Sequence, residues 1–308
     1  MYQAYIVGIF PRNDGLAYKW KLYERGELGE DEFLETLRES QEEVIRVQLE
    51  AGLSHIHDPY IDWHDIFRPF TDLEGIDVGP ITRYFENNTF YKKPVIRGKV
   101  RYPDGFILKY LHLDLMPRDR EWVASLPGPY TFLRLSMYKN LDDAKASIKN
   151  ILIGSALDMS DAGYKVITLH EPCIAYYNDI DWGLVQELYR AFDDYGIDVR
   201  IHLYFGDVKN KVDNLASLPI SSFSLDTAYT DITSMKNLDI NSVVLGVLDS
   251  QNTLMEDPTH IIESINILKD NNDVGTIALT PNTDLDFLTF DYAIKKVRLL
   301  GDIYRRLR

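Results

Sequence analysis

The stretch Val166-Ile-Thr-Leu-His-Glu-Pro172 is a short apolar run that ends in polar and turn-forming residues. The same pattern occurs eight times along the chain, usually with an amphipathic helical stretch before the next run. The runs cover residues 4–9, 53–57, 130–135, 166–169, 199–204, 222–225, 242–247 and 276–279. Strands that alternate with helices predict a parallel sheet covered by helices, and eight such units in 308 residues predict a (β/α)8 barrel.

The residues that directly follow these runs mark the expected functional site. A barrel of this kind keeps its chemistry at the carboxyl ends of its strands, where side chains from separate strands meet. The polar residues at these eight positions include Arg12, Asp58, Ser136, Glu171, Asp207, Asp226, Asp249 and Asn282.

The composition limits the class of protein. No apolar run reaches the roughly 20 residues that a membrane-spanning helix needs, and the first residues lack the basic flank and cleavage site of a signal peptide. The single cysteine, Cys173, excludes an internal disulfide and predicts a reducing, cytoplasmic location. A formal net charge of −15 disfavours nucleic acid as a partner.

One domain is predicted over residues 1–308, with an excursion from the barrel at about residues 60–126. Amphipathic periodicity predicts helices at 30–51, 144–162, 182–195, 259–270 and 288–307. Within the excursion, the turn Tyr102-Pro-Asp-Gly105 separates two alternating runs, 94–101 and 106–113, which predicts a hairpin there. The basic residues clustered at 92–101 are read as solubilising charge on an exposed hairpin rather than as an anion site.

Fragments spread over most of the chain resemble the cobalamin-independent methionine synthases, in particular their short archaeal members. The fragments keep the family's order, and several lie at predicted strand ends. They are Val7-Gly-Ile-Phe-Pro-Arg12, Trp63-His-Asp-Ile-Phe-Arg-Pro69, Asn87-Asn-Thr-Phe-Tyr-Lys-Lys-Pro94, Pro127-Gly-Pro-Tyr-Thr131, Glu171-Pro172, His202-Leu-Tyr-Phe-Gly-Asp207, Leu245-Gly-Val-Leu-Asp249 and Leu279-Thr-Pro-Asn282. The resemblance implies the barrel that this family shares with the uroporphyrinogen decarboxylases. It also implies methyl transfer to homocysteine, in methionine biosynthesis.

The zinc ligands of that family are only partly matched. The resemblance implies a zinc ion that holds homocysteine as a thiolate, bound by His-x-Cys on one strand, an acidic residue on the next and a Cys near the eighth. The matching positions here are His202, Tyr204, Asp226 and Thr283. Neutral hydroxyls are poor ligands for zinc, so no metal is expected in the isolated chain, with His202 and Asp226 as weak candidates.

The amino-acid pocket of the family has changed as well, with His170 in place of an aspartate and Tyr60 in place of a glutamate. These departures resemble the first, zinc-less barrel of the full-length enzymes.

The resemblance therefore implies a diverged barrel subunit whose partner is a separate zinc-bearing barrel chain. We expect the isolated chain to lack homocysteine methylation. The rim with Arg12, Tyr60, Trp63 and the basic 92–101 segment is expected to meet the partner or a folate-like methyl donor.

Several roles stay open for the individual residues. Glu171 and His202 form a candidate acid–base pair, or a relic held in a polar network. Tyr204 is a candidate hydroxyl donor to a ligand, or an aromatic plug in the vacated zinc space. The further candidates for ligand contacts are Arg12, Asp58, Tyr60, Trp63, Asp226, Asp249 and Asn282.

Two other functions remain as alternatives. The first is a binding or scaffolding barrel that has lost catalysis and presents a surface to another chain. The second is a metal-dependent hydrolase, because His55 and His57 are two apart on one predicted strand and His64 follows closely.

Overall fold

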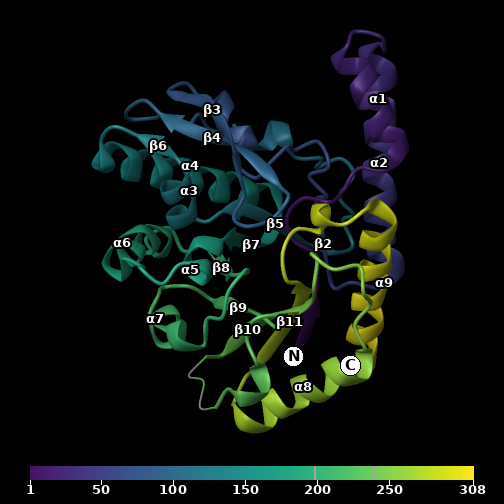
Figure 1. Ribbon diagram of the computed structural model, residues 1–308, viewed down its shortest axis with the longest axis vertical. Helices are drawn as coiled ribbons and strands as arrows, with labels where there is room; N and C mark the ends of the chain where they lie inside the picture. Colours follow the sequence, from purple (N-terminus) through teal and green to yellow (C-terminus); the bar gives the residue numbers. More distant parts are fainter. Residues whose placement is uncertain (198, 237, 239) are drawn as a thin grey trace.

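A computed structural model describes residues 1–197, 199–236, 238 and 240–308. Eight strands form one sheet in the order β1-β11-β10-β9-β8-β7-β5-β2, and the paired neighbours run parallel. The strands are β1 (Tyr2–Ala4), β2 (His55–His57), β5 (Glu121–Pro127), β7 (Tyr164–His170), β8 (Val199–His202), β9 (Ser222–Asp226), β10 (Ser242–Leu248) and β11 (Thr276–Pro281). The predicted (β/α)8 barrel with a hairpin-bearing insertion is confirmed (Figure 1).

Residue Ser54 brings the two ends of the sheet together. Its backbone N–H donates to the carbonyl oxygen of Ala4 at 3.0 Å, and its hydroxyl accepts from the Ala4 N–H at 2.8 Å. Small apolar side chains fill the interior of the barrel, among them Val7, Val123, Val166 and Val244. The interior is therefore a packed core rather than a channel.

Helices cover the outside of the barrel. They are α1 (Asp14–Glu24), α2 (Glu30–Ala51), α3 (Pro129–Leu135), α4 (Leu141–Ala162), α5 (Pro172–Tyr176), α6 (Trp182–Asp193), α7 (Val212–Ala216), α8 (Pro258–Asn271) and α9 (Phe290–Leu307). Short 3-10 turns lie at Arg68–Asp72, Ile107–Tyr110, Lys209–Lys211, Ile232–Ser234 and Leu285–Phe287. No helix in the described part of the chain is both long and apolar enough to cross a membrane.

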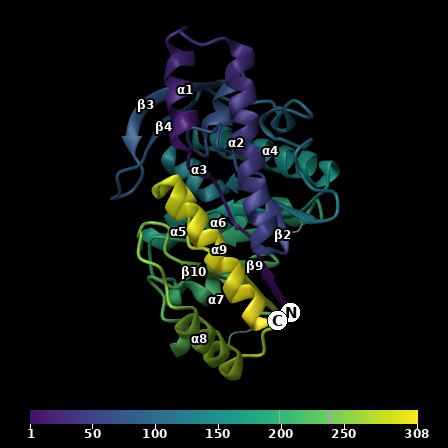
Figure 2. The same cartoon turned by 90° about the vertical axis from the view of Figure 1, so that its right-hand side faces the viewer.

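The longest helices lie where the amphipathic pattern predicts them. Helix α2 has the predicted bounds and stops at Gly52, whose φ of +76° is a left-handed conformation that favours glycine. Figure 2 shows α2 and α9 beside each other on one side of the barrel. Helix α1 packs on the outer part of α2 through Trp20 and Phe33, whose ring centroids are 5.0 Å apart.

The prediction of a third strand at residues 130–135 is wrong. These residues form α3, and the strand is β5, some nine residues earlier in the chain. The alternation of large and polar side chains in 130–135 is typical of a strand, but Pro129 begins a helix whose first N–H groups are bound by the Glu171 carboxylate. A contact from a distant strand thus overrides the local pattern.

The predicted hairpin is also misplaced. The hairpin of the excursion consists of β3 (Ile76–Arg83) and β4 (Phe90–Ile96), and the short β6 (Met137–Tyr138) adds to β4. The predicted turn at 102–105 instead docks on α4, because the N–H of Gly105 and the hydroxyl of Tyr102 both donate to Asp158. The three strands lie over the end of the barrel where α3 and α4 begin (Figure 1).

Candidate functional site at the barrel mouth

A buried polar layer crosses the mouth of the barrel, at the carboxyl ends of its strands. The side chains come from the ends of separate strands, and all are almost fully buried. They are His57, Ser125, Thr168, His170, His202, Asp226, Asn282, Thr283 and Asp284. The structure thus brings together His202, Asp226 and Asn282, three of the residues predicted for the site.

These three residues form one hydrogen-bonded chain. His202 Nε2 lies 2.9 Å from the carbonyl oxygen of Asn282, and Asn282 Nδ2 donates to Asp226 at 3.2 Å. Burial lowers the pKa of His202 to about 4 and raises the pKa of Asp226 to about 7. The imidazole is therefore neutral at neutral pH, and it donates from Nε2 to a backbone oxygen.

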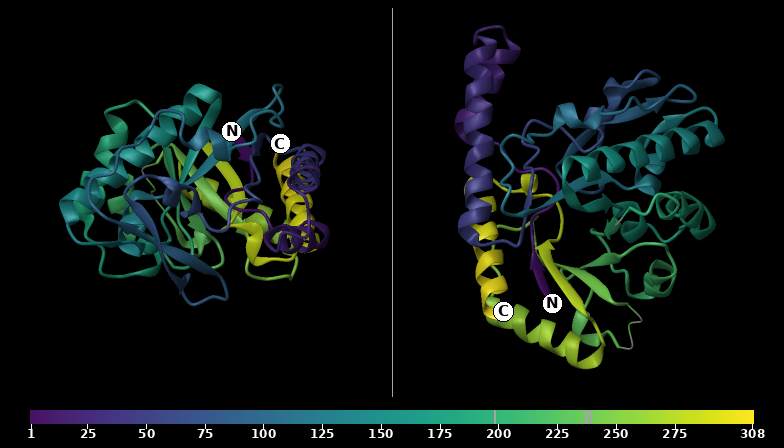
Figure 3. Two further views of the ribbon diagram at one scale, coloured as in Figure 1. Left: turned by 90° about the horizontal axis from the view of Figure 1, so that it is seen from above. Right: turned by 180° about the vertical axis from the view of Figure 1, so that it is seen from behind.

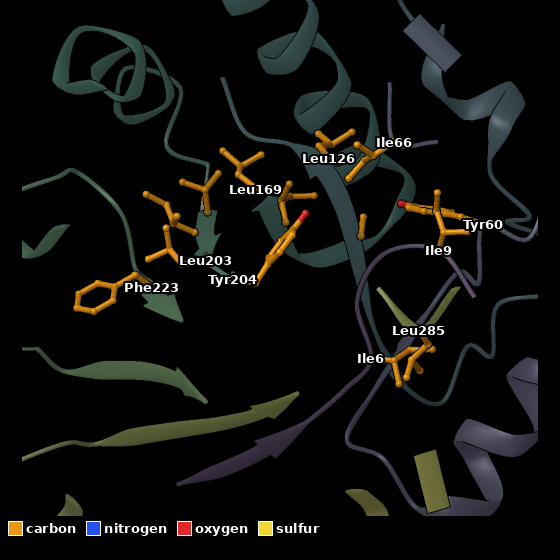
Figure 4. Packing of buried hydrophobic residues seen from close by; sticks show 14 of the residues in the cluster. Ile6, Ile9, Tyr60, Ile66, Leu126, Leu169, Leu203, Tyr204, Phe223 and Leu285 are labelled. Atoms are coloured by element: carbon orange, nitrogen blue, oxygen red, sulfur yellow. The ribbon is translucent and has the colours of Figure 1, made fainter. Parts of the chain in front are cut away.

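Tyr204 occupies the centre of the layer. Its hydroxyl lies 2.8 Å from the hydroxyl of Tyr84 and 3.4 Å from His170 Nδ1. Figure 4 shows the rings of Tyr60 and Tyr204 entering from opposite sides, with both hydroxyls pointing toward the middle of the mouth. Because Tyr84 follows β3, this hydrogen bond ties the excursion to the barrel.

Aromatic rings close the mouth above Tyr204. Phe85 and Phe205 pack with their ring centroids 5.4 Å apart, and both have a positive φ, 55° and 70°. This conformation is strained for bulky residues, so the surrounding packing must hold it. A cavity lined by Tyr84, Phe90 and Asp284 measures about 20 Å³, room for about one water molecule.

His57 belongs to a second strip of the layer. His57 Nε2 lies 2.8 Å from Ser125 Oγ, which is 2.8 Å from Thr168 Oγ1 and accepts the N–H of Gly8 at 2.9 Å. Sequence reasoning missed Ser125 because it placed the third strand at 130–135. With β5 in its true position, Ser125 would have been a candidate near a strand end.

His170 and Asp284 face each other without forming an ion pair. Their Nδ1 and Oδ1 atoms are 3.7 Å apart, but burial lowers the pKa of His170 well below its ordinary value and raises the pKa of Asp284 well above it. Burial therefore disfavours the charged form of each group. Gly8, with a φ of +65°, leaves the space that the Asp284 carboxylate fills.

A charged cluster lies on the other side of the mouth, beside the second strand. Asp58 is fully buried and accepts from the His112 backbone N–H at 2.6 Å and from His112 Nδ1 at 3.0 Å. Burial alone would lower the pKa of His112, but Asp58 and Asp62 raise it to about 10. Burial would raise the pKa of Asp58, but His112 holds it below its ordinary value.

The remaining predicted rim residues surround this charged cluster. Arg12 Nε donates to the carbonyl oxygen of Ile61 at 2.8 Å, and its guanidinium lies 3.7 Å from the centre of the Trp20 ring. Tyr60 stacks on Trp63 with centroids 4.0 Å apart. Arg12, Asp58, Tyr60 and Trp63 thus form one group that joins the loops after β1 and β2.

Glu171 is turned away from His202. Its carboxylate accepts from the N–H groups of Tyr130 and Thr131 at 2.9 and 2.8 Å, and also from the hydroxyls of Thr131 and Tyr189. Burial raises the pKa of Glu171 to about 7 in spite of these donors. The two side chains proposed as an acid–base pair therefore face different partners, and Glu171 holds the start of α3.

The histidines of the hydrolase hypothesis diverge. His55 Nε2 lies 2.9 Å from Glu121 Oε2 at the amino end of the barrel, His57 binds Ser125 in the interior, and the His64 ring packs on Trp20. Within the described residues, no group of three His, Cys, Asp or Glu side chains is placed to hold a metal ion. The structure gives this alternative no site.

Asp249 directly follows β10, at the carboxyl end of the barrel. Its carboxylate accepts the N–H of Gln251 at 2.9 Å, and it lines a cavity of about 600 Å³ between the 227–233 loop and α8. Its charge contributes to the raised pKa of Asp226, so Asp249 borders the polar layer at that residue.

The positions that match the zinc ligands do not fit a zinc ion. The Nε2 atom of His202 is hydrogen-bonded to a carbonyl oxygen, and the Tyr204 hydroxyl is bonded to Tyr84. Asp226 already accepts three hydrogen bonds, and the buried hydroxyl of Thr283 lies beside Tyr204. A borderline-soft cation would find one neutral imidazole, one carboxyl group that already accepts hydrogen bonds, and hydroxyls, but no thiolate.

Comparison with known proteins places these features in a family. Residues 74–273 match the family model described as the cobalamin-independent synthase, N-terminal domain. The chain is 22% identical to a methionine synthase of Thermococcus kodakarensis, over 95% of this chain and 89% of that protein. It is 21% identical to a 5-methyltetrahydropteroyltriglutamate–homocysteine methyltransferase of Haemophilus influenzae, over 98% of this chain and 42% of that protein.

The fold is also found among solved structures. A B12-independent methionine synthase from Shewanella sp. W3-18-1, solved in complex with selenomethionine, superposes with a TM-score of 0.74. The two chains are 15% identical, and the match covers 99% of this chain and 98% of the other. The overall fold is thus shared with that protein.

Proposed function

The chain belongs to the cobalamin-independent synthase family, N-terminal domain, and we propose that it serves methyl transfer to homocysteine as a zinc-less barrel subunit. In this proposal the zinc and the homocysteine thiolate are carried by a separate barrel chain of the same family. The cytoplasm is the proposed location, in keeping with the single cysteine.

One observation carries the proposal: tyrosine stands at the centre of the mouth, where the resemblance implies a thiolate. The Tyr204 hydroxyl is bound to Tyr84, and the rings of Phe85 and Phe205 cover the pair. A thiol is mostly protonated at neutral pH, so homocysteine needs a cation to become nucleophilic. Since the described mouth offers no such cation site, the chemistry is assigned to another chain.

The direct test is a reconstitution assay. Methionine formation from homocysteine and 5-methyltetrahydropteroyltriglutamate is measured with this chain, with a zinc-bearing barrel chain of the family from the same organism, and with both. We expect no turnover by this chain alone. With both chains present, the rate should be at least roughly tenfold higher than with the zinc-bearing chain alone, which corresponds to lowering the activation barrier by about 1.4 kcal/mol. In the mixture, His202→Ala should change the rate little, since His202 has no proposed chemical step.

Two outcomes would contradict the proposal. Turnover by the lone chain that is lost in His202→Ala would make this barrel the catalyst. A mixture no faster than the zinc-bearing chain alone would leave the binding or scaffolding role as the better assignment.

A second test asks whether the two substituted positions explain the lack of a zinc site. Purified wild-type protein should contain little zinc by metal analysis, whereas the double variant Tyr204→Cys/Thr283→Cys should retain zinc, because it adds two thiolate ligands near His202 and Asp226. The matched control, Tyr204→Ser/Thr283→Ser, opens the same space without thiolates and should not retain zinc. Tightly bound zinc in the wild type would show the substitution argument to be wrong.

A further inference from the structure

Two surfaces of opposite charge flank the mouth of the barrel. The first, the acidic arm, is the projecting part of α1 and α2, residues 14–43. The second, the basic sheet, consists of β3, β4 and β6 with the adjoining residues up to 101. Figure 1 shows the arm and the sheet on opposite sides of the molecule, and Figure 3 shows the same arrangement from behind.

The charge difference between the two surfaces is large. Residues 14–43 of the arm contain ten acidic and four basic side chains, whereas residues 76–101 of the basic sheet contain six basic and two acidic. The whole chain has a formal net charge of −15, so the basic sheet is a positively charged patch on a negatively charged protein. A reversed patch on a strongly charged protein favours an oppositely charged macromolecule as its partner.

Exposed apolar side chains lie within both charged surfaces. On the basic sheet, Ile81 is 69% exposed and stands opposite Lys92, and Phe90 stands opposite Arg83. On the acidic arm, Tyr18 is 64% exposed, and Leu34 is exposed among acidic residues of α2. Large apolar side chains among charges are typical of protein interfaces rather than of surfaces that only solvate the chain.

The edge of the basic sheet is not built to accept another strand. β3 is an edge strand, but Pro80 lacks an N–H group, and the register with β4 shifts between Val78 and Ile81. Both features protect an edge from strand addition. The outward side chains, not the backbone, are therefore the docking groups.

We propose that the basic sheet of one copy docks on the acidic arm of a second copy of this chain. Because the two surfaces flank the mouth on opposite sides, a two-fold axis between two facing barrels would satisfy both contacts at once. Each contact would join basic and acidic side chains around exposed apolar residues. The proposal does not depend on the methyl-transfer role.

The first test is the oligomeric state of the full chain, measured by sedimentation velocity over a dilution series. We expect a dimer at low ionic strength whose dissociation constant rises with added salt, because salt screens exposed charges. The variant Lys92→Glu/Lys93→Glu should raise that constant at least about tenfold. The matched control, Lys269→Glu/Lys295→Glu on α8 and α9, makes the same charge change away from both surfaces and should leave it unchanged.

A charge swap makes the test specific for the two surfaces. Glu32→Lys/Glu35→Lys on the arm should also weaken the dimer. Mixing this variant with Lys92→Glu/Lys93→Glu should restore a mixed dimer, since each contact then joins opposite charges again. Circular dichroism and thermal unfolding of each variant verify that the exposed substitutions leave the fold intact.

Several results would overturn the proposal. One is a wild type that stays monomeric at every concentration, and another is a dimer whose dissociation constant the charge reversals leave unchanged. A third is a failure of the two charge-reversed variants to form a mixed dimer when they are mixed. A monomer whose basic sheet binds the zinc-bearing barrel chain instead would overturn self-association and leave the proposed function standing. Binding of the monomer to phosphatidylglycerol vesicles, lost in Lys92→Glu/Lys93→Glu, would assign the sheet to a lipid surface instead.

Discussion

Two pairs of aspartate and histidine lie at the mouth of this barrel, and they differ in charge. Asp58 contacts His112 directly, and the pair is ionised, with the pKa of His112 raised to about 10. Asp226 and His202 are joined only through Asn282, and burial raises the pKa of the acid to about 7 and lowers that of the imidazole to about 4.

The comparison shows that burial alone does not decide ionisation. Asp58 and Asp226 are equally hidden, with 0% and 1% of their surface exposed. The difference is the partner: an imidazolium compensates the loss of water around Asp58, whereas Asp226 has only amide dipoles. Asp58 and His112 thus form a charged contact, whereas burial disfavours the charged forms of Asp226 and His202.

The largest expected effect comes from breaking the charged pair. Asp58→Asn leaves the His112 imidazolium largely buried without its main counter-ion. We expect the free energy of unfolding at pH 7 to fall by about 3 kcal/mol, measured by urea denaturation. The variant Asp226→Asn at the same pH is the control. If both variants lose the same free energy of unfolding, the two sides of the mouth do not differ in the way proposed.

The pH dependence of stability sharpens the comparison. The pKa of His112 is raised in the folded state, so its contribution is complete below its unfolded value and is lost as the pH rises through about 10. The pKa of Asp58 is lowered, so its contribution is lost as the pH falls below its ordinary value. Between pH 7 and pH 10.5, the wild type should lose about 3 kcal/mol more than His112→Gln.

Asp226→Asn should have a smaller effect, because it replaces a group that is already half protonated at neutral pH. We expect a loss of about 1 kcal/mol, because the amide has only one acceptor oxygen. If that oxygen keeps the bonds from Ala228 and Asn282, the NH2 group faces the Phe205 N–H, a donor against a donor. The raised pKa of Asp226 makes the wild type less stable as the pH rises from about 4 to about 7. Urea denaturation over that pH range should show that the free energy of unfolding falls less in Asp226→Asn than in the wild type.

The smallest effect should come from Tyr84→Phe, which removes the hydrogen bond between the excursion and Tyr204. The Tyr204 hydroxyl loses its nearest partner, so we expect about 1 kcal/mol or less. Hydrogen exchange should quicken in the 84–89 segment and not in β2. Faster exchange at Asp58 as well would mean that the two sides of the mouth open together.

Much of the fold could be predicted from local patterns. Six of the eight barrel strands and the long helices followed from apolar runs and amphipathic periodicity, since strands buried on both faces and surface helices leave clear signatures. The first strand, Tyr2–Ala4, lies earlier than the predicted run at residues 4–9. The third strand and the hairpin did not follow from these patterns. In 130–135 and 102–105, contacts with Glu171 and Asp158, distant in sequence, decide the structure.

The candidate site was predicted in part. His202, Tyr204, Asp226 and Asn282 were found because they follow recognisable strands, and the structure joins them in one layer. Tyr84 carried no signal, because it comes from the misplaced hairpin. The direction in which Glu171 points was equally hidden, since a strand end specifies a position and not a partner.

The sequence by itself determined the barrel and the family, because these depend on residue types and their order. Only the tertiary structure decided which buried groups are charged. Ionisation depends on the nearest partner in space, and the partners of Asp58 and Asp226 lie 54 and 56 residues away in the chain.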